Sequence, residues 1–282
     1  MPSRSNEPEA GRDRMRVAYL DCIAGITGDT ALAALLDAGV DLDEVRKHLS
    51  SLPLDPFELD VEEVEEQGIR ATRVVVRAHT TGVIRTYASV RTLLDAGALP
   101  GEAHRLAHRT LRLLAEAEGR VQRREPESVR FTDLGGLDTI VDVVGTALAL
   151  TSLGVERVFA SAVPTGLGMM RTEHGALPIP TPTVLELLRG APLFSRGVAS
   201  ELTNAAGAAI LAATVEGYGE MPTMRIEAIG YGAGSQRMDI PNLCRVLVGQ
   251  DEPASSRPSV PGTRELHLVT EPSTAPEPGD AG

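Results

Sequence analysis

The chain has 282 residues, a formal net charge of −12 and a pI near 5.0, and only 3% of its residues are aromatic. This length allows one large domain or two modest ones, with a core of aliphatic side chains. The acidic balance argues against a general nucleic-acid binder, which needs a basic face to displace the counterions of phosphates. No apolar run is long enough for a membrane span.

The two ends of the chain differ in composition from its middle. Residues 1–14 are polar, and residues 251–282 are rich in Pro, Ser, Glu and Gly, so both are predicted to be disordered tails. The N-terminus lacks the apolar core of a signal peptide, and Cys22 and Cys244 fit free thiols in a reducing compartment. We therefore expect a cytoplasmic protein whose ordered part, 15–250, is one unit or two packed lobes at about 15–125 and 126–250.

The first glycine-rich loop, CIAGITGDT, follows a predicted strand at 15–21 and precedes a predicted helix at about 29–38. Strand, loop and helix in this order offer free backbone N–H groups to an anion, so Gly25 and Gly28 are candidate phosphate-binding residues. The loop lacks the lysine of a P-loop. Alternatively, Asp21 and Asp29 face a metal ion, or Asp29 only stabilises the helix start.

Helices are predicted at 41–49, 87–96 and 102–118, with a hairpin of strands at 57–64 and 71–78 between the first two. His79 follows the hairpin and is a candidate metal ligand. His104 and His108 share one helix face. Their spacing can bind a metal, but the motif holds no acidic third ligand, so we interpret them as packing or solvent-facing residues.

The next helix, predicted at 138–153, is apolar almost all round and should be buried. A short strand at 129–131 and a loop with Asp133 precede it. Asp138 and Asp142 lie one turn apart on one face of this helix. A buried carboxylate is costly unless it is paired, hydrogen-bonded or metal-bound. Asp138 is explained as a helix cap, whereas Asp142 is either the partner of an arginine or a ligand-site residue.

The stretch 161–190 follows a strand predicted at 158–163. It combines a glycine-rich loop containing Gly166 and Gly168, a cluster of Arg171, Glu173 and His174, and a stiff Leu-Pro-Ile-Pro-Thr-Pro segment. A helix should start near 181 or 183. A charged cluster between a flexible and a stiff segment is typical of a binding site, although an ordinary surface crossover explains the same spacing.

The last predicted elements are an Ala-rich helix capped by Thr203 or Asn204 and two closing strands at 224–230 and 242–248. Between these strands lies a second glycine-rich loop, GYGAGSQRMDIPN. The elements together predict a mixed α/β fold, a mixed sheet covered by helices.

Five motifs occur in the order seen in one family: YLDCIAGITGD, DTIVDVVG, RTEHGALPIPTPTVLELLRG, ELTNAAGAAIL and GYGAGSQRMDIPNLCRVLVG. Over about 15–249 the chain resembles the nickel insertion proteins of nickel-pincer cofactor biosynthesis (the LarC family). The resemblance implies a lyase-type nickel chelatase. It would place Ni(II) into a pyridinium-3,5-bisthiocarboxylic acid mononucleotide, with CTP and Mn(II) or Mg(II) as further cofactors.

The task so implied needs nickel ligands that can release the metal to softer thiocarboxylates, and a base for the ring proton. We expect the catalytic residues to be His174, Glu173 and Asp142. The expected metal ligands are His174, Asp138, Asp142, Asp133, Asp21 and His79. The residues expected to hold the substrate phosphate or the cofactor are Arg171, Gly166, Gly168, Gly25 and Gly28.

The chain departs from the family pattern at three places. Ile84 and Thr132 stand where the family usually has histidine, Asp133 stands for glutamate, and residues 204–207 replace a Thr-Pro-Thr-Gly turn. Fewer nitrogen ligands should weaken nickel affinity. The alternatives are therefore a catalytically degenerate nickel or cofactor carrier or regulatory partner, and a phosphate- or nucleotide-handling enzyme without nickel.

Family members commonly carry a further C-terminal domain that binds the nucleotide triphosphate. The hypothesis is that this chain is the metal-handling part and that a separate CTP-binding polypeptide completes it. We also expect a homo-oligomer, without nucleic-acid or membrane partners.

Overall fold

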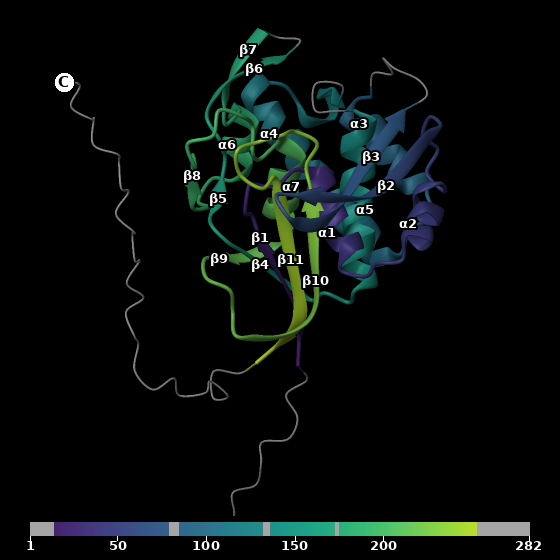
Figure 1. Cartoon of the computed structure of the whole chain (residues 1–282). Coiled ribbons are helices and arrows are strands. Elements are labelled where there is room, and N and C mark those ends of the chain that lie inside the picture. The colour runs from purple at the N-terminus through teal and green to yellow at the C-terminus, as the bar shows by residue number, and fades with distance from the viewer. Residues whose placement is uncertain (1–13, 79–84, 132–135, 173–174, 253–282) are drawn as a thin grey trace, which may run out of the picture.

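A computed structural model describes residues 14–78, 85–131, 136–172 and 175–252 (Figure 1). Its centre is a seven-stranded mixed sheet in the order β2-β3-β10-β11-β1-β4-β9. The strands are β1 (Arg16–Asp21), β2 (Phe57–Glu66), β3 (Ile69–Ala78), β4 (Arg157–Ala160), β9 (Val215–Tyr218), β10 (Met224–Ala233) and β11 (Leu243–Asp251). The mixed α/β fold expected from the sequence is confirmed.

The strand directions follow from the connections between them. The β2–β3 and β10–β11 pairs are antiparallel, as is β1 with β11, whereas β4 runs parallel to both β1 and β9. Parallel neighbours need crossover connections, which helices supply here. The two strands near the chain ends, β1 and β11, thus lie side by side at the centre of the sheet.

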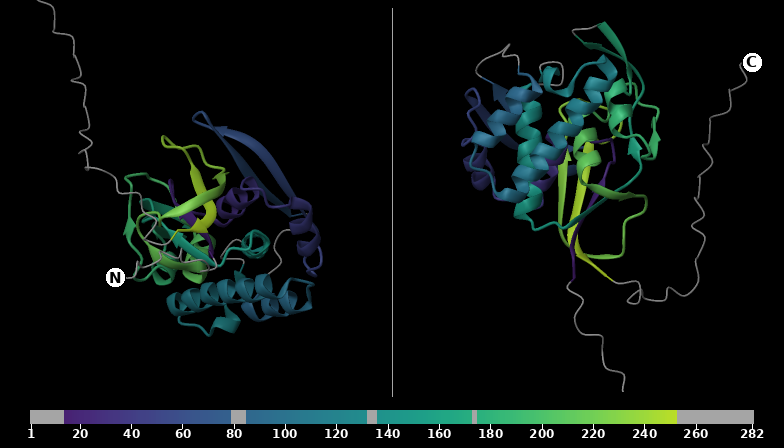
Figure 2. Two further views of the ribbon diagram at one scale, coloured as in Figure 1. Left: turned by 90° about the horizontal axis from the view of Figure 1, so that it is seen from below. Right: turned by 180° about the vertical axis from the view of Figure 1, so that it is seen from behind.

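The helices are α1 (Gly28–Asp37), α2 (Leu42–Leu49), α3 (Tyr87–Ala96), α4 (Gly101–Gln122), α5 (Leu137–Ser152), α6 (Pro182–Leu187) and α7 (Ala205–Thr214), with a 3-10 turn, η1, at Pro126–Ser128. Helix α1 packs on β10 and β11 and also on α5, which in turn packs on α4 (Figure 2). None of the helices in the part of the chain that the structure describes is long and apolar enough to cross a membrane.

Helix α5 lies inside the molecule, as its apolar sequence predicts. Its residues from Thr139 to Leu150 are all buried. Gly145 permits close contact with α1, since a Cβ at this position would lie 2.7 Å from Cδ2 of Leu32. The only acidic side chain within this buried run is Asp142.

The stretch after β4 differs from its prediction. The single strand expected at 158–163 is divided into β4 and the short β5 (Val163–Pro164), which pairs with β8 (Leu193–Phe194). The glycine-rich and proline-rich segments pair as a hairpin of β6 (Gly168–Thr172) and β7 (Gly175–Ile179) at one end of the molecule (Figure 1). The strand expected at 129–131 is reduced to one bridge between Arg130 and Thr86.

Candidate functional site

Two glycine-rich loops that are far apart in the sequence meet around a small cavity of about 200 Å³. Its walls come from the loop before α1, the turn before α7 and the loop between β10 and β11. The polar residues that line it include Thr27, Asp29, Glu201, Asn204 and Asn242. Among the described residues of its lining there are two carboxylates and no Lys or Arg, so the cavity favours a cation over an anion.

Close backbone contacts hold the first loop in place. Gly25 has φ +90°, and a Cβ there would lie 2.0 Å from the carbonyl oxygen of Leu202. Gly166 has φ +80°, and its Cβ would lie 1.8 Å from the carbonyl oxygen of Ser200. Both positions therefore require glycine for packing. This is a structural reason for two glycines that the sequence analysis assigned to a phosphate.

The buried hydroxyl of Thr203 joins three segments of the site. It accepts a hydrogen bond from the backbone N–H of Ile26 at 3.2 Å and donates one to the carbonyl of Pro164 at 2.8 Å. Next to it, the side chain of Asn204 caps α7 by accepting a bond from the Gly207 N–H at 2.9 Å, as expected. The turn before α7 is thereby fixed against the first glycine-rich loop.

Asp29 lies in the first turn of α1, on the cavity wall. Its carboxylate accepts a hydrogen bond from the hydroxyl of Thr27, the residue that precedes the helix. Burial raises the pKa of Asp29, and the bonds from Thr27 and from backbone N–H groups offset part of that rise. A carboxylate here is therefore partly desolvated but still supported by donors.

Asp142 of α5 does not line the cavity itself but lies against Gly28, at the start of α1. The residue is only 6% exposed, and its Oδ1 has no hydrogen-bond partner among the described residues. Among the described residues no arginine pairs with it, so both interpretations offered by the sequence stay predictions. Burial raises the pKa of Asp142 well above its ordinary value, and the nearby Asp29 and Asp138 carboxylates raise it further.

Gly28 makes the room for this carboxyl group. A Cβ on Gly28 would lie 2.7 Å from Oδ2 of Asp142 and 2.8 Å from its Cβ. Asp138 lies one turn earlier on α5 and is an exposed residue. Partial desolvation of its carboxyl group raises its pKa, and the charge of Asp29 raises it further. The three carboxyl groups thus interact electrostatically, but they are not a group whose ligand atoms all lie within 4.8 Å of one another.

Glu201 is a site residue that the sequence analysis missed. It lines the cavity, and burial raises its pKa from 4.5 to about 7. Asn242 was also missed; its side chain donates to the carbonyl of Gln236 at 2.8 Å and so tethers the second glycine-rich loop. The available signal was the position of Glu201 just before an apolar helix, which alone indicates only a turn.

Three of the other candidate residues are described and do not line this cavity. The carboxylate of Asp21 is paired with Arg245 of β11. Gly168 and Arg171 belong to β6, and both are exposed. The remaining candidates lie outside the described residues: His79, Asp133, Glu173 and His174.

Comparison of the sequence with known proteins identifies the family to which the chain is similar. The family model described as "Nickel insertion protein" matches residues 18–267. A pyridinium-3,5-bisthiocarboxylic acid mononucleotide nickel insertion protein of Desulfitobacterium hafniense (strain DSM 10664 / DCB-2) is 39% identical over 256 residues, which cover 91% of this chain and 63% of the relative.

Two further relatives carry the name "Putative nickel insertion protein". The one from Wolinella succinogenes is 40% identical over 86% of this chain and 62% of its own length, and the one from Geobacter sp. (strain M21) is 42% identical over 84% and 62%. The chain thus spans somewhat less than two thirds of these curated relatives. No solved structure matches it. On the family match, which covers most of its residues, the chain belongs to the nickel insertion protein family.

Proposed function

We propose that this chain is the metal-handling part of an enzyme that inserts nickel into pyridinium-3,5-bisthiocarboxylic acid mononucleotide. Family membership and the name of the Desulfitobacterium relative support the reaction. The observation that carries the site is Oδ1 of Asp142, which is buried and has no hydrogen-bond partner among the described residues, in a carboxyl group whose pKa the Asp29 charge raises further. A buried carboxyl oxygen without a partner lowers the stability of the fold, and a bound cation would offset that loss.

Carboxylate oxygens suit the task of a donor site for nickel. They are harder ligands than thiocarboxylate sulfur, so they hold the metal weakly enough to pass it to the substrate. Asp142 must lose its proton to bind a cation, and its raised pKa means that nickel binding releases that proton. We assign Asp29 and Asp142 to nickel, with Asp138 adding negative charge that acts on Asp142.

Formation of the carbon–nickel bond also requires a base for the ring proton. Glu201, with its pKa raised to about 7, is matched to accept a proton near neutral pH. Asp142 is the second candidate within the described residues. From the sequence we retain His174 and Glu173 as catalytic candidates, His79 and Asp133 as metal ligands, and the exposed Arg171 as a contact for the substrate phosphate.

We place the remaining cofactors elsewhere. The cavity lining has no Lys or Arg among its described residues and gives a triphosphate no counter-charge. We therefore propose that CTP, with Mn(II) or Mg(II), binds to a separate CTP-binding polypeptide and not to this cavity. Homo-oligomer formation and a cytoplasmic location belong to the same proposal. Hydrolysis of CTP by this chain alone would contradict the proposal that a separate polypeptide binds CTP.

The test is an insertion assay on the purified chain, with nickel, the pyridinium mononucleotide, CTP, Mn(II) and the CTP-binding polypeptide, and with the product detected by mass spectrometry. Asp142→Asn should lose product formation, whereas Asp43→Asn, an exposed carboxylate on α2, should match the wild type. Nickel binding without any product in the wild type would favour the alternative of a nickel carrier. Full activity of Asp142→Asn would refute the site.

A further inference from the structure

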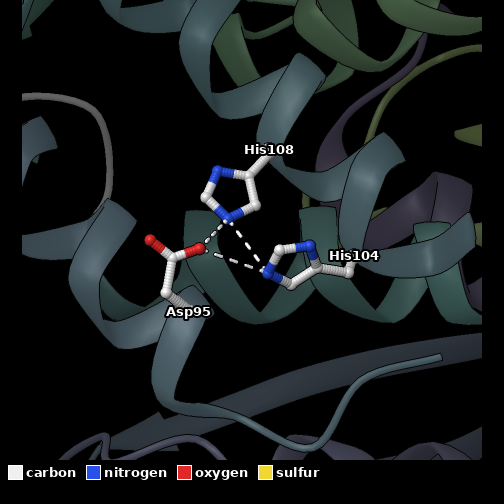
Figure 3. A group of neighbouring side chains, drawn as sticks. All are labelled: Asp95, His104 and His108. Atoms are coloured by element: carbon white, nitrogen blue, oxygen red, sulfur yellow. Dashed lines mark hydrogen bonds and ion pairs between the residues drawn. The ribbon is translucent and has the colours of Figure 1, made fainter. Parts of the chain in front are cut away.

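Three ligand-type side chains meet at a second place, between α3 and α4 (Figure 3). They are Asp95 from the end of α3 and His104 and His108 from the first turns of α4. Among the residues that the structure describes, they are the only group of three or more His, Cys, Asp or Glu whose ligand atoms all lie within 4.8 Å of one another. The acidic third ligand that the histidine motif lacks in sequence is thus supplied by the preceding helix.

The local sequence explains this meeting. Helix α3 ends at Ala96, Gly97 follows it, and α4 begins at Gly101 after Pro100. The short connection brings the end of α3 against the start of α4, whose residues four positions apart lie on one face. Asp95 is therefore opposite the histidine pair.

The distances between the ligand atoms fit a common metal ion. Nε2 of His104 and Nε2 of His108 are 3.2 Å apart, and Oδ1 of Asp95 lies 3.3 Å from the first and 2.9 Å from the second. Ligands at about 2.0–2.1 Å from a metal are separated by about 3.0 Å in an octahedral site and about 3.3 Å in a tetrahedral one. The triangle matches one face of such a coordination shell.

Hydrogen bonds alone cannot satisfy this triangle. If both histidines donate from Nε2 to Asp95, both Nε2 atoms carry hydrogen and the contact between them is repulsive. If one Nε2 accepts from the other, it has no proton for the carboxylate. A cation in the centre accepts a lone pair from all three atoms, so it resolves the conflict.

The surroundings carry more positive than negative charge. The open groove beside the triangle is lined by Tyr87, Arg91, Asp95, His104, Arg105, His108, Arg109 and Arg112. Arg105 and Arg112 pair with Glu102 and Glu116 of their own helix. Arg91 and Arg109 repel a bare metal cation, but they favour an anion as a further ligand of that metal.

We propose that Asp95, His104 and His108 form a site for a divalent transition-metal ion of the Ni(II) or Zn(II) type, separate from the carboxylate cavity. The two places share no lining residue. The site does not rest on the proposed insertion activity, because metal binding to it is measurable without substrate. Two imidazole nitrogens and one carboxylate suit nickel and zinc better than magnesium or calcium.

The experiment is calorimetric titration of the full chain with NiCl2 in a buffer that does not bind metals, repeated with ZnCl2. The variants are His104→Ala and His108→Ala, and the matched control is His48→Ala. His48 is half-buried on α2 and also lies near a carboxylate, with Nε2 3.9 Å from Glu44, but it belongs to no group of three ligands among the residues that the structure describes. Circular dichroism verifies that each variant is folded, which the surface position of the cluster favours.

We expect the wild type and His48→Ala to bind one equivalent more than His104→Ala and His108→Ala, or to bind that equivalent about 100-fold more tightly. In a parallel nitrogen-15 NMR titration with ZnCl2, the Nε2 resonances of both histidines should shift together. Equal stoichiometry and affinity in His104→Ala and the wild type would overturn the proposal. So would a shift of neither resonance.

Discussion

Replacement of Glu201 by glutamine should make the protein more stable, and by an amount that depends on pH. Burial raises the pKa of Glu201 from 4.5 to about 7 in the folded chain, whereas the unfolded chain keeps the ordinary value. The folded state therefore binds the proton more tightly. The free energy of unfolding of the wild type must fall as pH rises from about 4.5 to about 7, and glutamine lacks this loss.

The size of the effect follows from the two pKa values. Each pH unit between them corresponds to about 1.4 kcal/mol, so the full difference is about 3 kcal/mol. The advantage of Glu201→Gln over the wild type should grow from near zero at about pH 4 to about 3 kcal/mol at about pH 8. The contributions of other titrating groups cancel in this comparison.

Urea unfolding of both proteins in the presence of EDTA, followed by circular dichroism between about pH 5 and pH 8, measures the difference directly. Glu65→Gln, an exposed glutamate on β2, is the matched control and should show no growing advantage. A stability difference between Glu201→Gln and the wild type that stays constant across this range would refute the argument that burial perturbs Glu201.

Three further results are expected. Gly28→Ala should lower the free energy of unfolding by about 1–3 kcal/mol, because the new Cβ would lie 2.7 Å from Oδ2 of Asp142. Thr203→Val should lower the free energy of unfolding by about 1–3 kcal/mol, because the N–H of Ile26 and the carbonyl of Pro164 lose their hydrogen-bond partner. Both cysteine thiols should resist Ellman's reagent in the folded chain and react after denaturation, because both are buried, and burial raises the pKa of Cys22 to about 12.

Each of these has a direct control. Gly101→Ala, at the start of α4, meets only the flexible end of Arg105 at 3.6 Å and should be neutral or slightly stabilising in the same urea series. Thr92→Val, exposed on α3, should change stability little. Equal effects in the Gly28 and Gly101 variants, or in the two threonine variants, would contradict the packing argument. Rapid labelling of the folded chain would contradict the burial of the thiols.

The elements of the fold were largely predictable because their signals are local. The helix at 87–96 was predicted with its observed bounds, and α5 was predicted as buried because its sequence is apolar almost all round. The β6–β7 hairpin was not predicted. Its prolines suggested a stiff single segment, and pairing across Gly175 depends on contacts that propensity does not report.

The candidate site was only half predictable. Asp142 stood out because a carboxylate in an apolar helix demands an explanation. Glu201 did not, since its raised pKa comes from burial in a cavity formed by three distant segments. The contact of Asp95 with the histidine pair was missed for a different reason: the motif on α4 is visible in the sequence, but Asp95 lies on α3, and only the packing of the two helices brings them together.

The most direct test of the account is a crystal structure of the chain soaked with NiCl2 and the pyridinium mononucleotide, with anomalous data at the nickel edge. We expect an anomalous peak about 2.0–2.2 Å from a carboxylate oxygen of Asp29 or Asp142. A peak only between Asp95 and the two histidines would leave the second metal site standing and contradict the carboxylate cavity as the place where nickel is handled.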